Sequence, residues 1–164
     1  MEGSRILARM WVRIPLGALF EVVVMGKYIV LGKATELIRV CALGDDNRLR
    51  ELLADPFTDV NKRGSHGITA LMVAARFGYI HGVEELIRHG AHLNSQDDMG
   101  WTALIHAVAE NDIFMAKYLA KMDPTSLRLK DDYGMYIIEP FLEHNKDFMK
   151  YLADWLPDKL KAEI

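Results

Sequence analysis

Apolar residues in the middle of this chain recur at the spacing of short helices, and glycine or aspartate marks the turns between them. One helix is predicted over residues 69–75, a run of small and apolar residues that Thr69 would cap by accepting from early backbone N–H groups. It is expected to stop at Gly78, since glycine adopts the left-handed conformation without Cβ strain. A second helix is predicted over residues 80–89, and Gly90 follows its end.

The same pattern returns 33 residues further along the chain. The segment Gly67-Ile68-Thr69-Ala70-Leu71-Met72-Val73-Ala74 is matched by Gly100-Trp101-Thr102-Ala103-Leu104-Ile105-His106-Ala107. In the second copy Asn111 replaces the helix-ending glycine, and asparagine best tolerates the same left-handed conformation. Self-similarity at a fixed period of this length predicts a stacked array of helix–turn–helix units.

Two less regular units flank this pair. Residues 36–61 fit a first unit that lacks its turn, as an N-terminal cap would. In a last unit the first helix is expected to stop at Asn145, with Tyr136 in the place of the capping threonine. Its second helix, at residues 148–153, repeats the sequence of residues 114–120 with one residue fewer.

The residues of the clearest unit carry a family resemblance. Gly67, Thr69-Ala70-Leu71-Met72 and Gly78, followed by Gly90-Ala91 and Leu93-Asn94, resemble the ankyrin repeat. The Thr-Ala-Leu-Met form is similar to that of ankyrin-only proteins of some protists. The resemblance implies an all-α ankyrin-repeat solenoid of about four helix–turn–helix units whose end units are degenerate caps. Four leucines are expected in its core, namely Leu71, Leu86, Leu104 and Leu119.

The resemblance also implies where a partner binds, which is the concave groove lined by the turn tips and the exposed side of the first helices. These positions are rich in aromatic residues and methionine, which are typical interface anchors. The predicted partner-binding residues are His66, Ile68, Phe77, Met99, Trp101, Glu110, Tyr133 and Met135. For Trp101, packing within its own turn is an equal alternative.

The charge of the predicted turn tips changes sign along the array. Lys62 and Arg63 lie in the first tip, Asp97 and Asp98 in the second, and a further aspartate pair at residues 131–132 in the third. Such a gradient could orient a charged partner. The favoured alternative is that these are solvated turn residues, because aspartate is common in turns for its own backbone hydrogen bonds.

Residues 1–33 are set apart as an N-terminal extension before the predicted repeat domain at residues 34–156, which a tail at residues 157–164 follows. Within this extension, arginines precede an apolar stretch, which is also typical of a targeting segment or a membrane anchor. Charged residues interrupt the stretch, which argues against a membrane span. A third hypothesis is a mis-annotated start. Residues 11–15 match the translation of the T-arm of a transfer RNA gene, which would place the authentic start at Met25.

Composition narrows the classes of function. The net charge of −3 and the absence of a basic segment give no support for nucleic-acid binding. Cys41 is the only cysteine, so no intrachain disulfide forms, which favours a reducing compartment such as the cytoplasm or the nucleus. It is predicted to be a buried structural thiol.

No catalytic or cofactor-binding motif is found in the sequence. The spacing of His81, Glu85, His89 and His92 would be compatible with a zinc site on the surface. Because the sequence contains no HExxH motif, neither a metal nor a cofactor is expected.

The sequence therefore predicts a non-catalytic, monomeric protein–protein interaction module with another protein as its partner and no membrane contact. Three alternatives stay open. The first is a regulatory inhibitor of an enzyme such as a kinase. The second is a membrane-tethered or organellar adaptor with residues 1–33 as its targeting segment, and the third is a metal-dependent enzyme, which would have to retain a metal after chelation.

Overall fold

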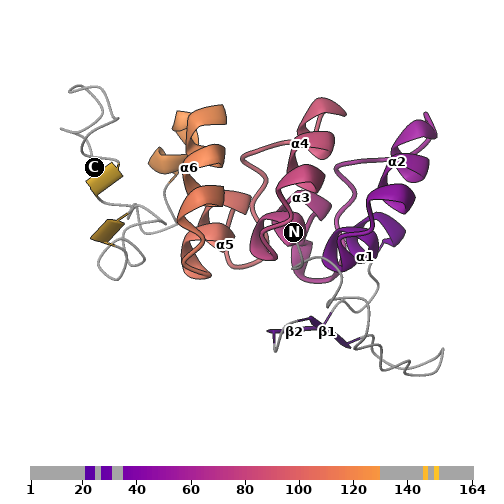
Figure 1. Ribbon diagram of the computed structural model, residues 1–164, viewed down its shortest axis with the longest axis horizontal. Helices are drawn as coiled ribbons and strands as arrows, with labels where there is room; N and C mark the ends of the chain where they lie inside the picture. Colours follow the sequence, from indigo (N-terminus) through magenta and orange to yellow (C-terminus); the bar gives the residue numbers. More distant parts are fainter. Residues whose placement is uncertain (1–20, 25–26, 31–34, 130–145, 148–149, 152–164) are drawn as a thin grey trace, which may run out of the picture.

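The protein folds as a stack of helix pairs. The structure is a computed structural model that describes residues 21–24, 27–30, 35–129, 146–147 and 150–151. Its helices are α1 (Glu36–Leu43), α2 (Asp46–Ala54), α3 (Ala70–Arg76), α4 (Ile80–Arg88), α5 (Ala103–Ala109) and α6 (Ile113–Met122). In Figure 1 the first helices α1, α3 and α5 form one row and the second helices α2, α4 and α6 form another. The predicted helical solenoid is confirmed.

Local chemistry sets the helix ends. Thr69 and Thr102 cap α3 and α5, because each side-chain oxygen accepts from the backbone N–H three residues later, at 3.3 and 3.4 Å. Gly78 ends its first helix with φ 68°, and Asn111 adopts φ 58° at the matching position. Both the threonine cap and the asparagine replacement are therefore confirmed.

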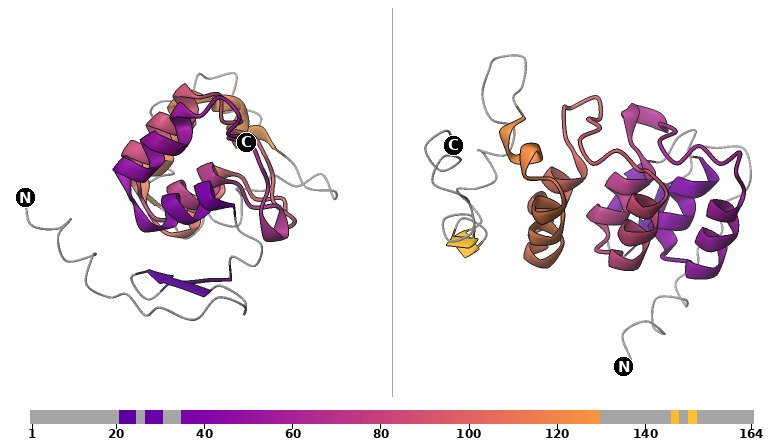
Figure 2. Two further views of the ribbon diagram at one scale, coloured as in Figure 1. Left: turned by 90° about the vertical axis from the view of Figure 1, so that its right-hand side faces the viewer. Right: turned by 90° about the horizontal axis from the view of Figure 1, so that it is seen from above.

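Neighbouring units bury one another's apolar faces. Helix α3 packs between α1 and α5, α2 packs against α4, and each first helix also packs against its own second helix. Figure 2 shows the units nearly superimposed when viewed along the stack. The four leucines predicted as core are all at most 2% exposed: Leu71, Leu86, Leu104 and Leu119. No unit covers its own core, so stability comes from stacking.

A hairpin that the sequence analysis did not predict precedes the stack. Strand β1 (Glu21–Val24) pairs antiparallel with β2 (Lys27–Val30), and β1 contacts α1. The register pairs Val24 with Lys27, so two residues connect the strands, and the β-branched valines favour strand over helix. A start at Met25 would remove β1. Within the described part of the chain, we find no helix with the length and hydropathy of a membrane span.

The C-terminal part of the predicted array is described only in pieces. After α6 a 3-10 helix, η3 (Pro124–Arg128), buries Leu127 completely. Residues 146–147 and 150–151 are helical, and Tyr151 packs against the core. The predicted third turn and the first helix of the last unit lie outside the described residues.

Candidate functional site

Two turns project from the stack and carry four of the six predicted binding residues that the structure describes. We call residues 61–68 the first finger and residues 94–101 the second finger. The first finger contains the short 3-10 helix η2 (Ser65–Gly67) and is closed by a hydrogen bond from the Gly64 N–H to the Ile68 carbonyl, at 2.8 Å. His66, at its tip, has φ 57° and is exposed.

The two fingers are joined to each other by hydrogen bonds. The Asp98 N–H donates to the His66 carbonyl at 3.0 Å, and the Arg63 guanidinium donates to the Gln96 carbonyl at 2.7 Å. The same guanidinium lies 3.9 Å from the Asp98 carboxylate. The opposite charges predicted at the two tips therefore meet at the junction of the fingers. A surface fixed in this way loses little conformational freedom when a partner binds.

The second finger is organised around the buried carboxylate of Asp97, whose residue is only 8% exposed. One oxygen accepts the backbone N–H groups of Met99 and Trp101, each at 2.9 Å. The other oxygen lies 2.9 Å from Nε2 of His106 in α5. The interpretation of Asp97 as a solvated turn residue, or as an exposed charge of a gradient, was wrong. The hydrogen bonds of Asp97 to the backbone of its own turn were expected, but its burial and its contact with His106 were not.

His106 completes this arrangement from inside the stack. Burial lowers the pKa of the imidazole, and Arg76 lowers it further, while the Asp97 and Glu110 carboxylates act in the opposite direction. The neutral ring therefore donates from Nε2 to Asp97. The Trp101 ring meets it edge-on, with the ring centroids 5.3 Å apart. The half-buried Trp101 thus packs against the first helix of its own unit, and its role as a partner-binding anchor stays a prediction.

The lowered pKa of His106 predicts a loss of stability on mild acidification. Because the ring's pKa in the folded state lies below the unfolded value of 6.5, the unfolded chain binds the proton first as the pH falls. Stability is therefore fully present above that value and is lost as the pH falls towards the folded pKa. Urea unfolding at about pH 7.5 and about pH 5.5 measures the change. The His106→Gln variant, which does not titrate there, should show a smaller decrease, and an equal decrease would contradict this assignment.

The structure places the other predicted site residues in different environments. Met99, at the tip of the second finger, is 65% exposed. Ile68 and Phe77 are half-buried and pack against the core. Glu110 accepts from the Arg76 guanidinium at 3.1 Å, which joins α3 to the end of α5. The remaining two, Tyr133 and Met135, lie outside the described residues, so the predicted continuous stripe is described only in part.

The histidines weighed as zinc ligands make other contacts. His81 lies 2.8 Å from the Asp46 carboxylate of the preceding unit, and His89 bonds to the Glu85 carbonyl. In the part of the chain that the structure describes, no three His, Cys, Asp or Glu side chains are grouped to hold a metal ion. Burial raises the pKa of the Cys41 thiol to about 12, which confirms the prediction of a buried structural thiol.

Sequence reasoning missed the Asp97–His106 pair, although a signal for it exists. One repeat earlier the matching positions are Gly64 and Val73, so both residues of the pair are missing from that copy. Two polar residues that are present together in one copy and absent together from another indicate a specific interaction between them.

Comparisons with known proteins agree with this architecture. A family model described as "Ankyrin repeats (3 copies)" matches residues 37–131. "Ankyrin repeat and SAM domain-containing protein 6" of Rattus norvegicus is 29% identical over 103 residues, which is 62% of this chain and 12% of that protein. "Neurogenic locus notch homolog protein 1" of Mus musculus is 39% identical over 70 residues, or 43% of this chain and 3% of that protein. "Ankyrin repeat domain-containing protein 13B" of Homo sapiens is 26% identical over 118 residues, or 68% of this chain and 19% of that protein. The chain thus spans less than a fifth of each of these relatives.

Proposed function

The chain belongs to the ankyrin-repeat family, and from this membership we propose that it is a non-catalytic module that binds a partner protein along its fingers and first helices. Ankyrin repeats are generally protein–protein interaction modules, and the family is typically non-catalytic. We further propose that it acts as a monomer in the cytoplasm or the nucleus, a placement that rests on its single, buried cysteine.

One observation supports the finger surface most directly. Met99 is a large apolar side chain held 65% exposed on a turn whose backbone is fixed by Asp97 on one side and by the first finger on the other. An exposed methionine on a fixed backbone, two residues from a half-buried tryptophan, provides apolar area that a partner can cover without first ordering the turn. His66 on the adjoining finger adds a polar group at the edge of the same surface.

Replacing Met99 tests this proposal without disturbing the core. We expect Met99→Ser to weaken partner binding about tenfold, because loss of an apolar anchor is worth roughly 1–2 kcal/mol. A partner is first captured by affinity purification and identified by mass spectrometry. The purified partner is then titrated with the wild type and with Met99→Ser, and calorimetry gives the dissociation constant of each complex. Since Met99 is exposed, its replacement should leave the unfolding curve unchanged.

The matched control is Phe57→Ser, which removes a side chain that is 92% exposed in the loop after α2. This variant should bind the same partner as the wild type does. If Phe57→Ser weakens binding and Met99→Ser does not, the partner binds a different face and the finger proposal is wrong.

A further inference from the structure

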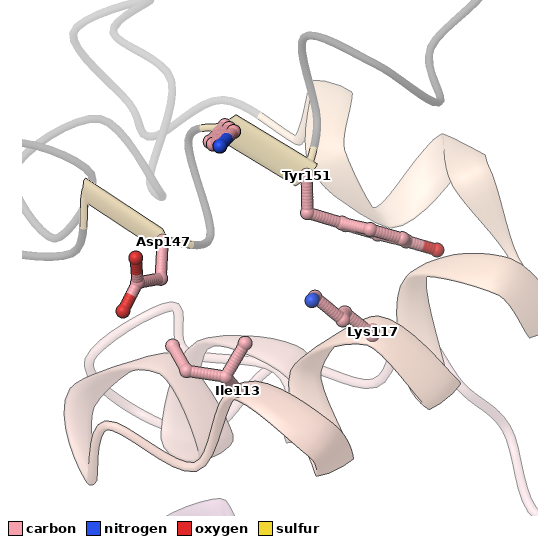
Figure 3. A pocket seen from close by; sticks show the side chains of 5 residues that line it. Ile113, Lys117, Asp147 and Tyr151 are labelled. Carbon is pink, nitrogen blue, oxygen red and sulfur yellow. The ribbon is translucent and has the colours of Figure 1, made fainter.

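A second surface with its own chemistry lies where α6 faces the last described helical residues. A cavity of about 450 Å³ opens there, lined by Ile113, Lys117, Asp147, Lys150 and Tyr151. Figure 3 shows Lys117 and Tyr151 on one side of the opening and Ile113 and Asp147 on the other. None of these residues belongs to either finger, so this cleft is independent of the surface proposed above.

The cleft carries a local excess of positive charge, because two lysines and a single carboxylate, that of Asp147, line it. Lys117 and Lys150 line it, Lys121 follows Lys117 by one helical turn, and Lys146 precedes Asp147. Among the described residues, none of these four lysines forms an ion pair with a carboxylate. By contrast, five arginines of the stack are ion-paired: Arg39, Arg48, Arg63, Arg76 and Arg88.

The two acidic residues nearest in sequence to Lys117 make hydrogen bonds at the ends of α6. The Asp112 side chain caps α6 by accepting from Met115, and the Asp123 side chain accepts from Asn94 and Thr125. Of the described residues that line the cleft, Asp147 alone carries a carboxylate. Because the whole chain has a net charge of −3, this local excess of lysine stands out as a site that attracts anions.

The walls of the cleft are apolar and aromatic. The Lys117 ammonium lies 4.8 Å from the centroid of the Tyr151 ring, a cation–π contact that holds both side chains at the opening. Burial raises the pKa of the Tyr151 phenol, so the ring is neutral at physiological pH. Ile113 supplies the apolar wall, and the neighbouring Phe114 is 71% exposed.

We propose that this cleft docks an acidic segment of a partner protein, with carboxylates paired to Lys117 and Lys150 and an apolar side chain against Ile113 and Tyr151. Charge complementarity steers such a segment to the lysines, and the apolar wall gives affinity that salt does not remove. Bare phosphate or a simple polyanion would use the lysines and leave the apolar wall uncovered. An acidic peptide that also carries apolar residues uses both.

The full chain is titrated into a fluorescein-labelled peptide of sequence EELFEE, and binding is followed by fluorescence anisotropy. We expect EELFEE to bind about tenfold tighter than the neutral peptide QQLFQQ, and Lys117→Gln/Lys150→Gln to weaken its binding about tenfold. The control Lys62→Gln/Arg50→Gln removes the same charge at exposed positions elsewhere and should change binding less than about twofold. Thermal unfolding confirms that both double variants are folded.

Three results would overturn the proposal. These are equal affinity for the two peptides, an equal loss in both double variants, and lysine-dependent binding to phosphatidylserine vesicles without binding to EELFEE. The Met99→Ser variant should bind EELFEE as the wild type does. Failure of the cleft is therefore distinguishable from failure of the finger surface.

Discussion

The Leu104→Ala variant is expected to lose ~2–5 kcal/mol of unfolding free energy, the range for truncating a buried leucine. Leu104 is 1% exposed in α5, which packs against both α3 and α6. Truncation at this place removes apolar contacts within the unit and leaves a cavity beside its neighbour. Because a domain of this size is stabilised by only about 5–15 kcal/mol, the loss is a large part of the total.

Urea denaturation followed by circular dichroism measures this effect. The matched control is Phe114→Ala, since Phe114 lies at the start of α6 but is 71% exposed. The control should stay within about 0.5 kcal/mol of the wild type, as is usual for surface substitutions. A Leu104→Ala variant as stable as this control would show that α5 does not pack as described.

The Asp97→Ala variant should destabilise the protein by roughly 3 kcal/mol, because each buried polar group left without a partner costs about 1–3 kcal/mol. The Asp97 carboxylate is the acceptor for His106 and for the N–H groups of Met99 and Trp101. Its removal leaves the buried imidazole without this bond and frees the turn. We therefore expect an earlier unfolding transition and faster amide hydrogen exchange at Met99 and Trp101.

The neighbouring aspartate supplies the control for this experiment. The Asp98 side chain is 63% exposed and contacts Arg63 only at 3.9 Å, so Asp98→Ala should cost at most about 1 kcal/mol. In the double variant Asp97→Gly/His106→Val the residues of the preceding unit replace the pair. It should be more stable than the sum of the two single changes predicts, by about 1 kcal/mol or more. Strict additivity would show that the two side chains do not interact.

The features that the sequence predicted well are those that local chemistry determines. Thr69 caps a helix because its oxygen reaches an N–H three residues away, and Asn111 ends one because its side chain tolerates the left-handed conformation. The 33-residue period then places Leu104 in the same environment as Leu71. Each of these inferences needs only neighbours within one unit.

The features that were missed depend on contacts that turn chemistry and the helical period do not predict by themselves. Turn chemistry predicts that Asp97 bonds to its own backbone but does not reveal that a histidine nine residues later covers it. Ile68 and Phe77 occupy variable positions of the repeat, yet both fold back onto the core. The β1–β2 hairpin was overlooked because the apolar stretch was judged as a targeting segment, although its valines and the two-residue connection favour strands.

The bonds between units have a consequence for how the chain folds. Among the described residues, eight side-chain hydrogen bonds tie one unit to the next, and all of them close loops of 29 to 35 residues. The entropic free-energy cost of closing a loop grows only with the logarithm of its length, so between loops of 29 and 35 residues this cost differs by about 0.2 kcal/mol. Chain entropy therefore favours no particular pair of units as the first to assemble. The folding nucleus should therefore form in the units whose local contacts are strongest. A single substitution that weakens those contacts is expected to shift the start of folding from one end of the array to the other.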